Sequence, residues 1–334
     1  MRKKQAAGRI LTLSVMVLGA IAIWSFLIHF GVGAISGSLH NLGLAGFIIF
    51  CSYTLGVLGL LGVSWYVIAP STPLRQLPGF VFGRIMREVA ADILPLAQLG
   101  GFVVGVRGAC LFGVSTSLAI ASTLVDLGAE MAGQLLFTMI GLSVLSLRPP
   151  PNFPHKIVDP AIYAGLVLGI VTAAGFFFSQ HFAPRILTRL SVRWPEKMRA
   201  HLASVQLELA DIYRQPARVA LSMGLHLMAW LVAVGGVWLT LRLMGARMPL
   251  PMVLVMESLV YLLRSVAFFV PGALGIMEGG YVLLGPILGL PAEIALSLAL
   301  IKRGRDLAIG SLAVATWQIL EGRWLLGWSS RPSS

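Results

Sequence analysis

The chain has 334 residues, of which 57% are hydrophobic and only 11% are charged, and its formal net charge is +12. Long apolar runs with so few charges exclude an ordinary water-soluble domain and indicate an integral membrane protein. The positive charge does not indicate nucleic-acid binding, because the basic residues gather between apolar segments. Anionic lipid headgroups at the cytoplasmic face are the partner expected for basic residues in those positions.

The apolar segments predict an all-α polytopic membrane protein, with a single transmembrane domain over 1–334. At ~1.5 Å per residue, helices of this length cross a hydrocarbon core of about 30 Å. Basic residues lie in the N-terminal tail, after the second span, in the centre and at the C-terminus, and the positive-inside rule then places both termini in the cytoplasm. About six full crossings are expected, at 10–30, 42–69, 115–147, 160–178, 219–243 and 292–320.

A first broken-helix unit is expected at 81–147, after the second span. Within it, residues 81–113 carry too many charges for a plain span and are interrupted at Pro95 and at Gly100-Gly101. Irregular backbone is tolerated at membrane depth only where protein buries it or where it lines a wet cavity. The sequence therefore predicts a re-entrant hairpin that enters from the cytoplasm.

The central segment, 183–218, is polar and basic but has helical periodicity. Two interpretations remain open: a cytoplasmic amphipathic helix on the inner leaflet, or packing against the cytoplasmic ends of the spans. Apolar residues recur at intervals of four and three, which is the period of one helix face: Met198, Leu202, Val205, Leu209 and Ile212.

A second broken-helix unit is expected at 251–320, and it contains the sequence FFVPGALGIMEGG over 268–280. Its proline and glycines make a continuous spanning helix improbable, so a re-entrant element beside a pathway or binding site is predicted. The alternative is a short kink that lets helices pack closely. The residues expected to act as hinges here are Pro271, Gly272, Gly275, Gly279 and Gly280.

The two broken units overlay when the sequence is shifted by 176 positions. Pro95 then meets Pro271, Gly113 meets Gly289, and Glu88 meets Arg264. Three predicted crossings separate the units, so the first would enter from the cytoplasm and the second from outside. Similar broken units of opposite orientation are typical of inverted-repeat transporters, whose site lies at the repeat interface.

Charged and polar residues recur within the apolar segments at helical spacing. Because a charge in hydrocarbon is costly, each needs a partner or a wet cavity. One interpretation is a polar groove for a zwitterionic or hydroxylated headgroup, and the other is structural pairing between the two halves. His226 is interpreted as a packed histidine. The residues assigned to the groove are Arg84, Glu88, Asp92, Arg107, Asp126, Glu130, Gln134, Glu257, Arg264, Glu278, Lys302, Arg303 and Asp306.

Enzyme signatures are absent from the sequence. It holds no glycine-rich phosphate loop, no HExxH, no nucleophile elbow and no Cys/His metal spacing. We therefore expect no catalytic residue, no cofactor and no metal. Embedded acid–base chemistry stays open, because carboxylates and basic residues are present.

Four motifs resemble a group of bacterial membrane proteins associated with hopanoid biosynthesis, within the superfamily of the flippase domain of lysyl-phosphatidylglycerol synthases. The resemblance implies a bacterial inner-membrane protein that moves a lipid between leaflets, and it does not imply aminoacyl transfer. The motifs are RExxxDxLPxxQxGG (87–101), ASTxxDxxxExxxQ (121–134), RSxxFFVPGxLGxxEGG (264–280) and RxRD (303–306).

Three functions follow from these patterns. The first is flippase-like movement of a lipid, such as a hopanoid or a phospholipid, along the polar groove. The second is a membrane scaffold that binds lipid-synthesis enzymes through the basic segment 183–218. The third is a membrane-embedded lipid-modifying enzyme, which would yield a new product in lipid extracts.

Overall fold

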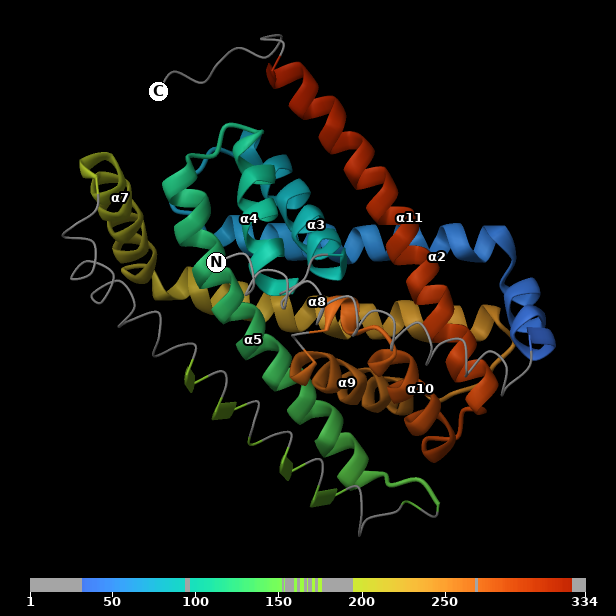
Figure 1. The fold of residues 1–334 in the computed structure, drawn as a ribbon. Coiled ribbons are helices and arrows are strands. Elements are labelled where there is room, and N and C mark those ends of the chain that lie inside the picture. The colour runs from blue at the N-terminus through green and yellow to red at the C-terminus, as the bar shows by residue number, and fades with distance from the viewer. Residues whose placement is uncertain are drawn as a thin grey trace, which may run out of the picture.

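The structure is a computed structural model that describes residues 32–93, 97–151, 153, 195–267 and 270–325, with isolated positions between 159 and 175. Across these residues it is all-helical, with nine α-helices, two short 3-10 turns and no strand (Figure 1). The predicted span 10–30, most of the predicted span 160–178 and Pro95 lie outside the described residues.

Three of the described helices are long and apolar enough to cross a membrane. They are the His40–Ile68 part of α2 (Val32–Ile68), then α5 (Thr116–Leu147) and α8 (Pro216–Leu243). They coincide with the spans predicted at 42–69, 115–147 and 219–243. Gly43 adopts φ 62° and kinks α2 near the start of its apolar part.

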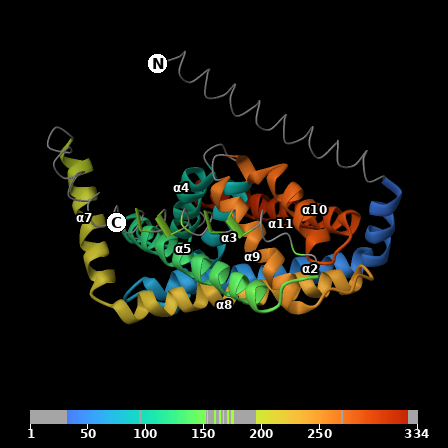
Figure 2. The same cartoon turned by 90° about the horizontal axis from the view of Figure 1, so that it is seen from below.

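Helices α2 and α8 pack side by side in antiparallel directions along the whole molecule (Figures 1 and 2). The Tyr53 hydroxyl donates to the Val232 carbonyl at 2.8 Å. Eleven residues further along α2, Ser64 pairs its hydroxyl with that of Ser222, which lies ten residues earlier on α8. These two contacts fix the register of the pair.

Helices α3 (Leu77–Ile93) and α4 (Ala97–Cys110) form a tightly packed hairpin after the short turn Leu74–Gln76. A Cβ atom on Gly83 would stand 2.7 Å from the Gly105 carbonyl oxygen, so only glycine allows this approach. The helix α4 runs through Gly100 and Gly101 without a break. The interruption predicted at these two glycines is therefore absent, and Gly101 packs against the Arg87 backbone.

Gly83→Ala is expected to destabilise the protein by about 1–3 kcal/mol, because the new methyl group meets backbone atoms that cannot move aside. Gly56→Ala is the matched control, since a Cβ there meets nothing within 4 Å and alanine favours a helix by up to about 1 kcal/mol. Unfolding by SDS titration in mixed micelles measures both changes. Equal stability of the two variants would contradict the close packing.

The second broken unit consists of α9 (Leu250–Val266), the turn Pro271–Ala273, α10 (Ile276–Ile287) and α11 (Ala292–Leu325). The chain breaks as predicted at Gly272 and Gly275, which have φ 57° and 79°. Gly279 and Gly280 instead lie inside α10, so the break does not extend to them. At 34 residues, α11 is long enough to span, but it carries four charged residues at 302–306.

Helix bounds recur in the two halves at the predicted shift. Thr116 and Ala292, the first residues of α5 and α11, are 176 positions apart, as are His40 and Pro216 at the starts of the apolar parts of α2 and α8. Helices α3 and α9, and likewise α4 and α10, agree within three residues at each end.

Contacts between helices recur at the same shift as their bounds. Gln134 of α5 donates to Ser265 of α9. A Cβ on Gly310, which corresponds to Gln134, would stand 3.4 Å from Val89, which corresponds to Ser265. The contact of α5 with α9 therefore has a counterpart in the contact of α11 with α3.

The amphipathic segment contributes α7 (Glu196–Tyr213), which stands at one end of the molecule (Figure 2). Val205, Leu209 and Ile212 of its apolar face are buried against Ala121 and Val125 of α5. The C-terminal part of that face therefore packs on a spanning helix, whereas Met198 at the other end is exposed.

Candidate functional site

A cleft opens at the centre of the described helices, where α2, α3, α8, α9 and α11 meet. It offers about 80 Å³ to the centres of water molecules, and one water needs about 10–15 Å³, so several fit side by side. The walls from α2 and α8 are largely apolar. The charged residues of the lining come from α3, α9 and α11: Arg84, Glu88, Asp92, Glu257, Arg264, Lys302, Arg305 and Asp306.

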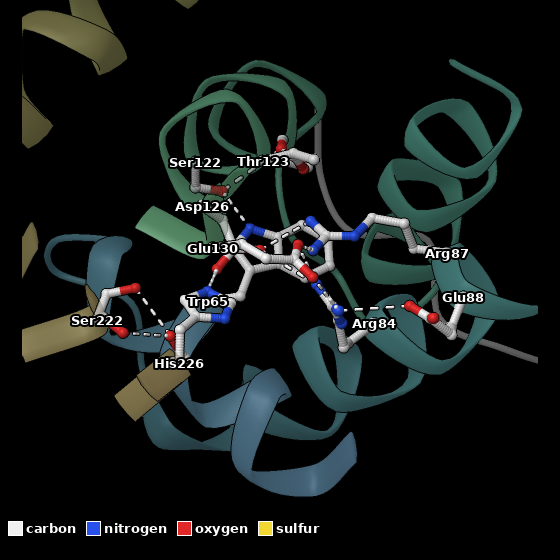
Figure 3. Close-up of polar contacts among 12 residues, drawn as sticks. Trp65, Arg84, Arg87, Glu88, Ser122, Thr123, Asp126, Glu130, Ser222 and His226 are labelled. Carbon is white, nitrogen blue, oxygen red and sulfur yellow. Dashed lines mark hydrogen bonds and ion pairs between the residues drawn. The ribbon is translucent and has the colours of Figure 1, made fainter. Parts of the chain in front are cut away.

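Two arginines of α3 bind two carboxylates of α5 beside the cleft (Figure 3). Arg84 donates to both oxygens of Glu130, at 2.7 and 2.6 Å. Arg87 donates to Asp126 at 2.7 Å and also to Glu130. Bidentate arginine pairs of this kind are strong and directional. Arg84 also lines the cleft, so it separates the open space from the carboxylates of α5.

Two members of this network were not predicted to belong to it. His226 was interpreted as a packed histidine, and it is fully buried, but its Nε2 also lies 2.9 Å from Oδ1 of the equally buried Asp126. Arg87 was not assigned to the groove, and only 4% of its side chain is exposed. Spacing along one helix does not predict these contacts, because each side chain finds its partner on another helix.

Arg264 of α9 connects the two halves of the chain across the cleft. Its Nη2 donates to Glu88 Oε1 and to Asp92 Oδ1 of α3, at 3.0 Å each. Glu88 and Arg264 are the pair of charges that the 176-residue shift aligned. These three side chains are 20–33% exposed, so water reaches this part of the network.

A second, buried network connects α9, α10 and α11. Lys302 donates to Glu257 at 2.7 Å, and Tyr281 donates its hydroxyl to the other oxygen of Glu257 at 2.6 Å. Lys302 also lies 2.5 Å from the Tyr281 oxygen and over the ring of Tyr261. Tyr281 and Tyr261 were not predicted, because tyrosines in apolar segments give no signal of such pairing.

Glu278 and Arg303 hold the broken backbone rather than line the cleft. Glu278 accepts from the Gly275 amide at 2.8 Å, which caps α10, and from Arg303 at 2.7 Å. Arg303 also donates to the Gly272 carbonyl at 2.6 Å. Neither side chain is among the residues that line the cleft. The pair instead satisfies backbone groups that the break leaves open.

Arg107 and Gln134 also do not line this cleft. Arg107 of α4 pairs with Glu321 of α11 at 2.5 Å, away from the central helices. Gln134 donates to the Tyr261 carbonyl and to Ser265. The sequence missed Arg305, whose guanidinium binds Asp306 at 2.7 Å and lies over the Phe50 ring. Its position two residues after Arg303 in the RxRD motif was the available signal.

The cleft combines features that suit a ligand with both polar and apolar parts. Carboxylates and guanidinium groups lie within one space, while α2 and α8 supply an apolar wall. Glu88, Arg264 and Asp306 are each about a quarter to a third exposed, so part of their hydrogen-bonding capacity faces the open space. Among the described residues, no group of three or more His, Cys, Asp or Glu side chains is placed to hold a metal ion.

Comparison with known proteins gives one match. A family model described as the lysylphosphatidylglycerol synthase TM region matches residues 10–313. No curated protein and no solved structure matches the chain. Together with the three apolar spans, the match makes the chain a multi-pass membrane protein of a lipid-related family.

Proposed function

The chain belongs to the family of lysylphosphatidylglycerol synthase transmembrane regions, and on that premise we propose that it moves a lipid between the leaflets of the bacterial inner membrane. The observation that carries the proposal is the cleft. Its acidic and basic side chains would bind a headgroup, and its apolar wall would leave the acyl or ring portion toward the bilayer. No chemical change to the lipid is part of the proposal.

The architecture that goes with this function is an inverted repeat. In it, 10–30, 160–178 and α11 complete six crossings, both termini are cytoplasmic, and the units 81–147 and 251–320 each contain a re-entrant element. The antiparallel packing of α2 and α8, together with the helix bounds that recur at 176 residues, supports opposite orientation of the halves. Sites of such transporters lie at the repeat interface, which is where this cleft lies.

The cargo we propose is a hopanoid or a phospholipid. The motifs at residues 87–101 and 121–134 favour the hopanoid-associated branch of the family. The family match supports a lipid cargo without indicating which lipid. Anionic headgroups at the cytoplasmic face would contact the basic residues around α7. Enzymes of lipid synthesis would be natural partners for supplying the cargo.

Neutralising the exposed charges of the cleft should slow lipid transfer. We expect Asp306→Asn and Glu88→Gln each to lower the initial rate at least tenfold, because each removes a headgroup partner that faces the open space. Arg107→Gln, whose side chain does not line the cleft, should leave the rate within twofold. Reconstituted vesicles with a fluorescent phospholipid in one leaflet, bleached from outside by dithionite, measure the rate.

The outcome that would contradict the proposal is specific. If the wild-type protein gives no transfer above empty vesicles for phospholipid or labelled hopanoid, or if both cleft variants match it, the cleft is not a lipid route. Chromatography of the lipids after the same experiment tests the enzymatic alternative. Detection of a new lipid species would indicate that the protein modifies the lipid rather than transfers it.

A further inference from the structure

The cleft lies between corresponding positions of the two halves. Glu88 and Arg264 correspond under the 176-residue shift, they touch at 3.0 Å, and both line the cleft. Corresponding residues can touch each other only near the axis that relates the halves. The walls from α2 and α8 also contain corresponding residues. Both members of four such pairs line the cleft: Tyr53 and Ala229, Thr54 and Trp230, Val57 and Ala233, Leu61 and Val237.

Helix α11 departs most clearly from this correspondence. Lys302, Arg305, Asp306 and Ile309 of α11 line the cleft, but none of their counterparts on α5 does. Those counterparts are Asp126, Ala129, Glu130 and Gly133.

The α5 side is closed by side chains that the α11 side lacks. Arg84 and Arg87 bind Asp126 and Glu130, and His226 binds Asp126 from α8. Their counterparts at Val260, Leu263 and Phe50 carry no charge. The α11 side therefore lacks this network, and Lys302 pairs with Glu257 and Tyr281 instead. The cleft is therefore open toward one of two related helices and closed toward the other by the Arg84–Glu130 contact.

We propose that the α5 face forms a second cleft, which opens when the α11 cleft closes, and that the arginine–carboxylate network of α3 and α5 is the latch between the two states. The inference rests on the proposed inverted repeat, in which exchange of the two halves turns the opening toward the opposite leaflet. The second cleft would be lined by Asp126, Ala129 and Glu130 of α5. Headgroup charges or water entering it would replace the partners that the carboxylates lose.

A fixed difference between the halves is the alternative to this device. Gly83 and Gly105 allow α3 and α4 to pack closely, whereas their counterparts are Leu259 and Tyr281. A permanent asymmetry of packing would leave the α11 cleft open whatever happens to the latch. A two-state device links the two sides, so that opening one closes the other.

Cysteine labelling tests that link without any measurement of transport. With Cys51 and Cys110 replaced by serine, single cysteines are placed at Ala129 and at Ile309 and reacted with a small water-soluble methanethiosulfonate in reconstituted vesicles. We expect Ile309→Cys to react at least tenfold faster than Ala129→Cys. Adding Glu130→Gln, which weakens the latch, should raise the Ala129→Cys rate at least fivefold and lower the Ile309→Cys rate by a similar factor.

Two results would overturn the proposal. If Glu130→Gln raises labelling at Ala129→Cys but leaves Ile309→Cys unchanged, the change is local loosening, and if neither rate moves there is no latch. Arg84→Lys keeps the charge but loses the bidentate contact, and should shift both rates in the same directions by a smaller factor if Glu130→Gln fails to fold. If the two labelling rates change in opposite directions but no lipid is transferred, the two-state inference holds and only the proposed lipid transport is wrong.

Discussion

Asp126→Ala is expected to lower the free energy of unfolding by about 3–5 kcal/mol, because it removes one member of a buried charged network. Asp126 is fully buried and accepts from Arg87 at 2.7 Å. It is also the partner of His226, whose other ring nitrogen has no hydrogen-bond partner among the described atoms. The substitution leaves a buried guanidinium group and a buried imidazole short of partners.

The measurement is unfolding by SDS titration in mixed micelles, with two controls. Asp126→Asn keeps the shape and one acceptor oxygen, so it should lose clearly less than Asp126→Ala. Arg199→Ala, on the exposed face of α7, should stay within about 0.5 kcal/mol of the wild type. A loss under 1 kcal/mol for Asp126→Ala would show that the network is hydrated rather than dry.

Lys302→Met should also cost about 3–5 kcal/mol, and a second substitution should reverse most of that loss. Lys302 is the buried cation that pairs with Glu257. Without it, the buried carboxylate keeps only the hydrogen bond from the Tyr281 hydroxyl. In Lys302→Met with Glu257→Gln, the uncompensated charge disappears while the tyrosine can still donate to the amide oxygen. Removing one partner of a buried pair is far more costly than removing both.

A double-mutant cycle on the same unfolding assay checks this expectation. We expect a coupling energy of at least about 2 kcal/mol, above the 0.5–1 kcal/mol of exposed pairs. Arg107→Gln with Glu321→Gln is the comparison cycle, since those side chains are 36% and 26% exposed. Additive losses at Lys302 and Glu257 would mean that the two side chains do not depend on each other.

Helix faces could be predicted from the sequence, but their partners could not. The i, i+4, i+8 spacing of Arg84, Glu88 and Asp92 placed them on one face, and the structure has them on one face of α3. The spacing carries no information on which helix lies opposite. The partners of Arg87 and His226 were not predicted for this reason, since each side chain contacts Asp126 on another helix.

The backbone breaks show a similar limit. Around Pro271, a proline and two glycines with positive φ interrupt the chain as the sequence indicated. Gly100 and Gly101 are also glycines in an apolar segment, but they lie within a continuous helix. Glycine is used there because it lets two helices approach closely. Composition alone does not distinguish a glycine at a backbone break from a glycine at a close helix contact. The distance to the backbone of a neighbouring helix does distinguish them.

The docking of α7 on α5 has a consequence for the exposed surface of the protein. Val205, Leu209 and Ile212 attach this polar helix to the same span that carries Asp126 and Glu130. A shift of α5 would therefore be transmitted to α7, whose other face is exposed. A fluorophore at the exposed position Leu207 would report such shifts in real time. A protein that binds α7 would slow the movement of α5.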